Sequence, residues 1–190
     1  IAQVENGKPI PGTEEHYDCD TLLLSCGLLP ENELSRAAGV ALSPITGGPS
    51  VNESLETNIP GVFAAGNVLH VHDLVDYVSE EAGAAGEHAA AYILKNEHAA
   101  GRTLPVRCEN GVRYTVPTAI RPDCAGDTVT LRFRVGGVYK NKKIAVYLGD
   151  TCIFSRRRPV LAPGEMETVR LKADLLRGAG DAVTVTLEEG

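Results

Sequence analysis

The stretch TNIPGVFAAGNVLHVHDLVDYVSEEAGAAGEHAA, residues 57–90, joins a short apolar run to a long helical pattern through a glycine turn. Residues 61–66 are apolar and bounded by glycine, as is typical of a strand buried in a parallel sheet. Residues 74–96 predict a long helix, which Asp73 or Asp76 is expected to cap. A polar loop therefore lies between a strand end and a helix start, where open α/β sheets bind ligands.

Two residues of this loop suit a ligand. Gly66 has no side chain, so a ligand can pass close to its backbone, and Asn67 offers an acceptor and two donor hydrogens to a sugar or polyol hydroxyl. The helix that follows points free N–H groups and its positive dipole end at the same crevice. Its residues 83–86, GAAG, form a thin surface that can pack against a sheet or a cofactor. The alternative is a close-packed core helix.

The residues before this stretch predict short elements. Residues 1–19 contain the turn NGKPIPG between two short extended pieces. Residues 20–27, DTLLLSCG, predict another buried parallel strand. Residues 31–38 can form two helical turns, which Gly39 ends, and residues 43–60 read as a short hairpin or extended loop.

From residue 106 onward the pattern is that of β-strands. In TVTLRFRV, residues 128–135, apolar side chains alternate with Thr and Arg. KIAVYLGDTCIFSR predicts two strands around Gly149 and Asp150, and VTVTL near the end alternates too. Short strands separated by Gly and Pro indicate an antiparallel sandwich or small barrel.

The charge of the chain changes near residue 100. Residues 1–100 carry 15 acidic and 3 basic side chains, whereas residues 101–190 carry 10 acidic and 15 basic ones. This change supports a domain boundary there. The net charge of −7 argues against non-specific nucleic-acid binding. No apolar run approaches the ~20 residues of a membrane helix, and no secretion signal is visible.

The cysteines predict reduced thiols in the cytoplasm. There are five of them, an odd number, and no pair has the CxxC spacing of a redox or zinc site. We expect Cys26 and Cys152 to lie in strands as small apolar side chains.

PGVFAAGN, followed by a helix with AAGEHAA, resembles the second flavin-binding segment of the pyridine nucleotide–disulphide oxidoreductase superfamily. Within it, the chain resembles the carboxyl-terminal part of FAD-dependent NAD(P) oxidoreductases associated with anaerobic glycerol-3-phosphate dehydrogenases, partly through YKNKKI and LAPGEME in its tail. The resemblance implies an α/β fragment followed by a small all-β, sandwich-like domain. Residues 1–29 would end the NAD(P)-binding domain, residues 30–100 would be the carboxyl-terminal part of the FAD-binding domain, and residues 101–190 would be the all-β domain.

The resemblance also assigns roles to residues. It implies a nicotinamide-nucleotide contact for Ser25, Cys26 and Gly27. It implies a flavin contact at the ribityl–phosphate chain for Gly66, Asn67 and Val68, and at the N1–C2=O edge of the ring for Val78 and Ser79. The family usually has Asp where this chain has Asn67, so a hydrogen bond to a ribityl hydroxyl remains while a negative charge is lost.

Two motifs that the family uses are missing. The GxGxxG turn of a dinucleotide-binding domain and the CxxC of disulphide reductases do not occur. We therefore expect the carboxyl-terminal portion of a longer protein, which by itself binds FAD weakly or not at all. The parent is expected to pass electrons between NAD(P)H and an acceptor through FAD. The alternative is a non-catalytic β-sandwich module that docks a redox partner, such as a dehydrogenase subunit or an electron carrier.

Several titratable residues near the turn have more than one possible role. His70 and His72 have a spacing that metal ligands can use, but no third ligand is evident, so we expect no metal site and place them in the cofactor crevice or in solvent. Glu80 and Glu81 can act as general acid or base near a flavin. The simpler expectation is that both are surface glutamates that complement the helix dipole.

A set of basic residues occurs in the predicted β region. Its members are Lys140, Lys142, Lys143, Arg156, Arg157 and Arg158. The simplest interpretation is a solvated strand edge, which charges protect from aggregation. The alternative is an interaction surface for an acidic partner or for the acidic residues 1–100.

Overall fold

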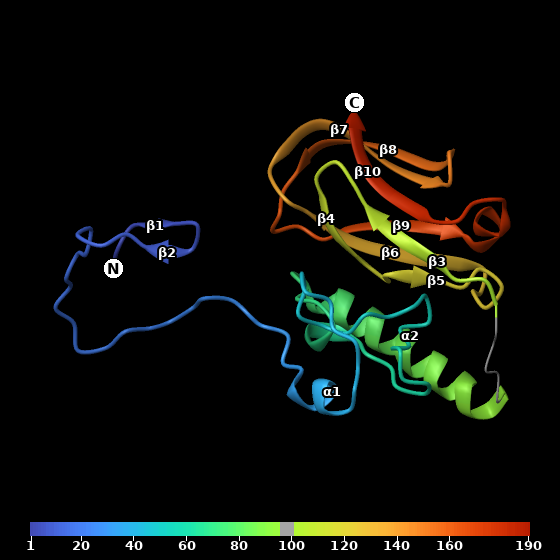
Figure 1. Ribbon diagram of the computed structural model, residues 1–190, viewed down its shortest axis with the longest axis horizontal. Coiled ribbons are helices and arrows are strands. Elements are labelled where there is room, and N and C mark those ends of the chain that lie inside the picture. Colours follow the sequence, from blue (N-terminus) through green and yellow to red (C-terminus); the bar gives the residue numbers. More distant parts are fainter. Residues whose placement is uncertain (96–100) are drawn as a thin grey trace.

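The computed structural model describes residues 1–95 and 101–190, and its carboxyl-terminal part consists of two packed sheets (Figure 1). The five-stranded sheet has the order β5-β3-β10-β7-β8 and the three-stranded sheet the order β4-β6-β9. The strands are β3 (Leu104–Cys108), β4 (Val112–Val116), β5 (Ala119–Ile120), β6 (Thr128–Val135), β7 (Tyr139–Leu148), β8 (Thr151–Leu161), β9 (Glu167–Lys172) and β10 (Val183–Glu189). A 3-10 helix, η2 (Ala173–Arg177), follows β9.

The alternating pattern of β6 builds the core between the sheets. Val129, Leu131, Phe133 and Val135 are buried, and they pack with apolar residues of the other strands in one cluster. The strand pairs are antiparallel except for β10 with β3, which run parallel. The predicted sandwich of short strands is therefore what residues 104–189 form.

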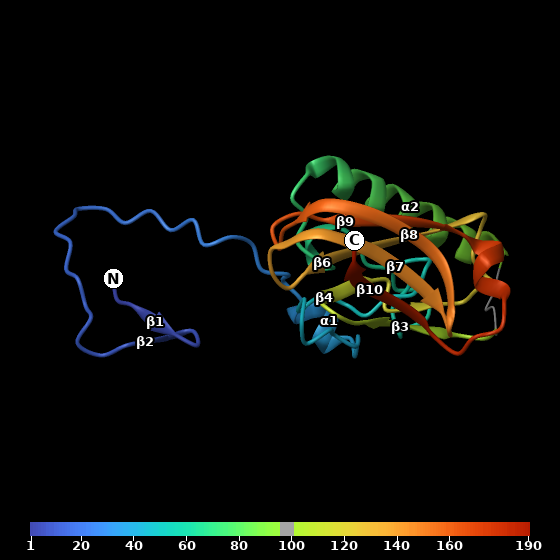
Figure 2. The same ribbon diagram turned by 90° about the horizontal axis from the view of Figure 1, so that it is seen from above.

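The first half of the chain contains short elements and one long helix. They are β1 (Val4–Glu5), β2 (Lys8–Pro9), α1 (Glu33–Ala37), the 3-10 helix η1 (Gly66–Val68) and α2 (Val75–Lys95). Figures 1 and 2 show β1, β2 and the chain after them lying apart from the rest, whereas α2 lies beside the β region. The predicted turn near the start and both predicted helices are confirmed. The predicted domain boundary falls at residues 96–100, which lie outside the described residues.

The two predicted buried strands of the first half do not form. Residues 20–27 are extended without pairing, and Leu22, Leu23 and Leu24 are 74–89% exposed. Residues 61–66 make only an isolated bridge between Glu56 and Phe63. A buried parallel strand needs neighbouring strands for its backbone N–H and C=O groups. Within residues 1–95 and 101–190 the structure places no strand beside either segment, so both predictions were wrong.

A second apolar cluster joins the loops of the first half to the β sheets. It contains Val51, Leu55, Ala64, Leu69 and Ala85 from the first half and Val116 from β4. The backbone N–H of Thr118 is also donated to the carbonyl oxygen of Val51, at 3.0 Å. The glycines of the thin face predicted for α2 do not pack against a sheet, because Gly83 and Gly86 are exposed and a Cβ at either would meet nothing within 4 Å. Only Ala85 of this group is buried.

The charge difference along the chain corresponds to an internal interface. Carboxylates of residues 53–81 form ion pairs with arginines of the β region. The pairs are Arg121 with Glu53 (3.0 Å) and Glu56 (3.2 Å), Arg132 with Glu80 (2.9 Å), Arg134 with Asp73 (3.4 Å) and Arg170 with Glu80 (2.6 Å).

The predicted basic set lies elsewhere, on β7 and the edge strand β8. Arg156 and Arg158 pair with Glu167 at 3.1 and 2.7 Å, so part of its charge is compensated within the β region. This position agrees with the interpretation of the set as a charged strand edge.

The cysteines and the membrane prediction can be compared with the structure directly. All five cysteines are free. Cys152 lies in β8 as predicted, whereas Cys26 lies outside any strand, so the strand predicted for Cys26 was wrong. Both side chains are exposed. No helix within residues 1–95 and 101–190 is both long and apolar enough to span a membrane.

Candidate functional site

Gly66 begins the turn η1 in a conformation that its surroundings require. Its φ is +71°, in the left-handed region that favours glycine, and a Cβ there would lie 3.2 Å from Cγ1 of Val78 in α2. Gly66 is itself buried, and its backbone N–H is donated to Oε1 of Glu81 at 2.8 Å. The close approach that the sequence predicted at Gly66 is therefore made by α2 of the same chain.

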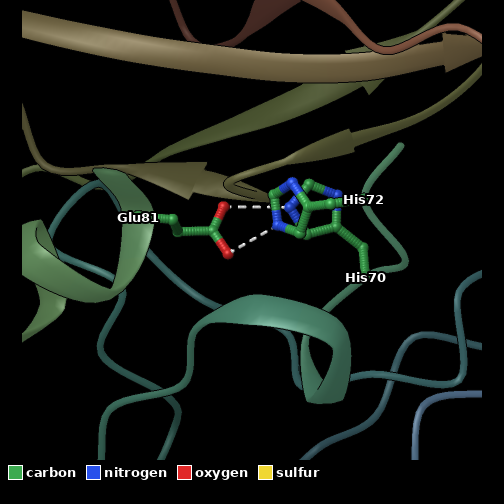
Figure 3. A group of neighbouring side chains, drawn as sticks. All are labelled: His70, His72 and Glu81. Carbon is green, nitrogen blue, oxygen red and sulfur yellow. Dashed lines mark hydrogen bonds and ion pairs between the residues drawn. The ribbon is translucent and has the colours of Figure 1, made fainter. Parts of the chain in front are cut away.

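Glu81 lies at the centre of a buried polar cluster beside this turn. Its carboxylate is fully buried and makes hydrogen bonds to Nε2 of His70 (2.9 Å) and to Nε2 of His72 (3.1 Å). Figure 3 shows Glu81 pointing from α2 toward the two imidazoles, which come from the chain that follows η1. Hydrogen bonds to this one carboxylate of α2 thus connect the helix with the turn and with the loop after it.

The charge of this cluster follows from its neighbours. Burial opposes ionisation of Glu81, but the hydrogen bonds from His70 and His72 outweigh it and lower the pKa of Glu81 to about 2. Burial also lowers the pKa of His70, despite the hydrogen bond to Glu81 that acts in the opposite direction. Nη1 of Arg132 lies 3.7 Å from Oε2 of Glu81. At neutral pH the cluster therefore holds a carboxylate beside a neutral His70.

For the histidines one of the two expected positions is excluded, and for Glu81 the expected surface position was wrong. His70 and His72 are 1% and 9% exposed, so neither lies in solvent, and Glu81 is 0% exposed and no surface glutamate. The spacing within the helix could have revealed this, because Glu81 is three residues after Val78 and four before the buried Ala85, on one helix face. Glu81 is also the third ligand-type residue that seemed to be missing beside the histidines.

Asn67 is the exposed polar residue of the turn. Its Oδ1 accepts the backbone N–H of His72 at 3.1 Å, which holds the loop in place. Its Nδ2 makes no hydrogen bond within the described residues. Asn67 can therefore donate to a ligand while its oxygen keeps the loop closed.

An asparagine that the sequence did not single out supports the same turn. Asn32 is buried before α1, and its Nδ2 donates to the carbonyl oxygens of Val68 (2.7 Å) and Gly47 (3.1 Å). Asp73, predicted as a helix cap, instead accepts from Arg134 (3.4 Å) and from the backbone N–H of Met166 (3.1 Å). These contacts fix both ends of the loop between η1 and α2.

The structure brings part of the predicted flavin set together. Gly66, Asn67 and Val68 form η1, which packs against α2 near Val78, and Ser79 is the next, exposed residue of that helix. Ser25, Cys26 and Gly27 lie in the exposed segment before α1, and both ribbon views show the chain before α1 extending away from α2, against which η1 packs (Figures 1 and 2). The predicted nicotinamide set and flavin set are thus not adjacent.

Comparisons with known proteins address the same part of the chain. Residues 2–89 match the family described as pyridine nucleotide-disulphide oxidoreductase. A segment of 59 residues is 32% identical to an NADH oxidase of Methanocaldococcus jannaschii, which is 31% of this chain and 13% of that protein. Residues 2–89 are thus similar to the pyridine nucleotide-disulphide oxidoreductase family. No solved structure matches the chain.

The family match covers part of the site. The family match includes η1 and most of α2 but ends before β3. The family match therefore covers the turn and most of the helix. The 59-residue segment that matches the NADH oxidase represents 13% of the length of that relative.

Proposed function

We propose that the protein is part of an FAD-dependent oxidoreductase that passes electrons between NAD(P)H and an acceptor. The observation that carries the proposal is the packing of η1 against the start of α2, where a Cβ on Gly66 would lie 3.2 Å from Val78. This packing places an exposed amide and a helix amino terminus side by side. The matched family region contains both elements.

The residues at this place suit a flavin nucleotide. The exposed Nδ2 of Asn67 can donate to a ribityl hydroxyl. The first-turn N–H groups of α2 and its positive dipole end favour negative charge, which develops on the N1–C2=O edge when a flavin is reduced. Leu74 and Val75 are 53% and 75% exposed, so apolar surface is available next to these donors. When bound, the flavin supplies the hydride chemistry, and these residues bind and orient it.

The contact to the nicotinamide nucleotide remains a separate part of the proposal. We assign it to Ser25, Cys26 and Gly27, because they lie within the matched family region and are exposed. The narrower relation to enzymes associated with anaerobic glycerol-3-phosphate dehydrogenase rests on the YKNKKI and LAPGEME segments of the β region and stays a prediction. Docking of a redox partner by the β region also stays a prediction.

The test uses the longest natural protein that contains these residues, purified without added cofactor. We expect the visible absorption of a bound flavin, and we expect NADH or NADPH to bleach it under anaerobic conditions. A colourless protein that takes up no added FAD would contradict the proposal. Flavin that is bound but not reduced by either nucleotide would contradict its NAD(P)H part alone.

A further inference from the structure

One group of buried side chains has the composition of a metal site. One nitrogen from each of His70 and His72 and one carboxylate oxygen of Glu81 all lie within 4.8 Å of one another. The two histidines come from the loop after η1, and Glu81 comes from α2 (Figure 3). It is the one such group within residues 1–95 and 101–190.

We propose that His70, His72 and Glu81 bind a divalent transition-metal ion, with Zn²⁺ as the best match. Two imidazoles and one carboxylate are a known set of three protein ligands for Zn²⁺, which then keeps a fourth position for water. Imidazole also favours Zn²⁺ over Mg²⁺ and Ca²⁺, which prefer oxygen ligands. The proposal is independent of flavin binding, although the site lies beside the proposed flavin turn.

The distances require little rearrangement. Nε2 of His70 and Nε2 of His72 lie 2.9 and 3.1 Å from the two carboxylate oxygens of Glu81. Two ligands of a tetrahedral ion with bonds of about 2.0–2.1 Å are about 3.3–3.4 Å apart. For these two pairs an ion can replace the shared hydrogens after shifts of a few tenths of an ångström, and the three ligand atoms, which lie within 4.8 Å of one another, would move toward the ion.

Hydrogen bonding within the chain leaves this cluster incomplete. Nδ1 of His70 and Nδ1 of His72 are buried and have no hydrogen-bond partner among the described residues. Burial of such groups opposes folding. An ion bound through Nε2 of each imidazole would not engage these Nδ1 atoms, but its bonds to the imidazoles and the carboxylate would contribute binding free energy that joins the loop to α2 more firmly.

The nearest positive charge is compensated by a separate carboxylate. Arg132 lies 3.7 Å from Glu81, but it also pairs with Glu80 at 2.9 Å, and Glu80 pairs with Arg170 at 2.6 Å. The backbone N–H of Gly66 occupies another direction around Oε1 of Glu81. The ion is therefore placed on the imidazole side of the carboxylate, away from Arg132.

The experiment titrates the untagged, chelator-treated chain with Zn²⁺ by calorimetry and with Co²⁺ by visible absorption. We expect one equivalent to bind, with the intense absorption of tetrahedral Co²⁺ and a rise in the unfolding temperature. The variants His72→Gln and Glu81→Gln should bind at least about 10-fold more weakly. The control is His16→Gln, because His16 is exposed and pairs only with the exposed Asp18.

Two results would overturn the proposal. One is a folded wild-type chain that binds neither ion at one equivalent. The other is equal binding by His72→Gln, Glu81→Gln and the His16→Gln control. If the two site variants fail to fold by circular dichroism, X-ray absorption of the wild-type chain with Zn²⁺ decides. A spectrum that contains scattering from two imidazoles bound to Zn²⁺ supports the site. A spectrum without imidazole scattering rejects the site.

Discussion

Arg121 of the β region binds the buried carboxylate of Glu53, which belongs to the first half of the chain, through a hydrogen bond and an ion pair. Its backbone N–H donates to Oε2 of Glu53 at 2.7 Å, and its guanidinium lies 3.0 Å from Oε1. The Glu53 side chain is 3% exposed, whereas that of Arg121 is 20% exposed. A nearly buried carboxylate thus depends on one arginine across the interface.

The first prediction concerns this pair. Arg121→Met keeps most of the side-chain volume but leaves Glu53 buried without its cation. We expect the free energy of unfolding to fall by about 1–3 kcal/mol, below the cost of breaking a fully buried pair because Arg121 is partly exposed. Urea unfolding measures the change. The control is Arg177→Met, which removes an exposed i,i+3 pair with Asp174 and should change stability by less than about 1 kcal/mol. Equal effects of the two substitutions would show that the interface pair has no special role.

The second prediction compares two glycines. Gly66→Ala forces alanine into φ +71° and brings its Cβ 3.2 Å from Val78, so we expect a loss of about 1–2 kcal/mol or more. Gly83→Ala adds a methyl group in open space within α2, where alanine is the better helix former, and should stabilise by about 0.5–1 kcal/mol. Thermal and urea unfolding of both variants should move in opposite directions. A destabilising Gly83→Ala would mean that another surface covers this face of α2.

Local patterns predicted the elements that depend on near neighbours in sequence. The alternation in residues 128–135 predicted β6, and possible capping residues together with acidic residues in the first half of the segment predicted α2. Residues 20–27 and 61–66 have the composition of buried strands, but a strand needs partners, and composition does not supply them. Such segments can be predicted only when the neighbouring strands are known.

The candidate site was predicted only in part, because local signals are visible in the sequence and contacts between distant residues are not. Gly66 and Asn67 were found because a glycine turn before a helix is a local signal. The burial of Glu81 was missed, since an acidic residue in the first half of a helix is normally exposed and complements the dipole. Its partners His70 and His72 lie 11 and 9 residues away, and only the fold brings their nitrogens to the carboxylate.

The third prediction concerns the cysteines. Burial raises the pKa of the Cys108 thiol, and the hydrogen bond to Thr115 offsets this only in part. Cys108 therefore holds less thiolate at neutral pH than an exposed cysteine, and the thiolate is the reactive form. With iodoacetamide near pH 7, Cys108 should react more slowly than the exposed Cys19, Cys26 and Cys152. Because burial raises the pKa of its thiol, the rate of Cys108 should still be rising with pH above about pH 8.5, the ordinary pKa of a cysteine.

Peptide mass spectrometry over time measures these rates site by site. Thr115→Val tests the cause, because it removes the hydrogen bond that lowers the pKa of Cys108. The pH at which Cys108 reaches half its maximal rate should then move upward. If Cys108 reacts as fast as Cys152 in the folded chain, the burial of its thiol is refuted.

The fourth prediction concerns Asn67 and FAD in the longest natural protein that contains these residues. Asn67→Asp keeps an acceptor for the backbone N–H of His72, and its carboxylate can still accept from a ribityl hydroxyl, so FAD should remain bound. Asn67→Leu removes both interactions. We expect its affinity for FAD to fall by about 3–10-fold, the equivalent of one hydrogen bond.

Asn58→Leu is the matched control, because Asn58 is also exposed and its Oδ1 also accepts a backbone N–H, that of Ala41 at 2.7 Å. Quenching of flavin fluorescence gives the affinities, and unfolding temperatures separate a weakened loop from a lost ligand contact. Equal affinity for FAD in the Asn67→Leu and Asn58→Leu proteins would remove Asn67 from the cofactor site.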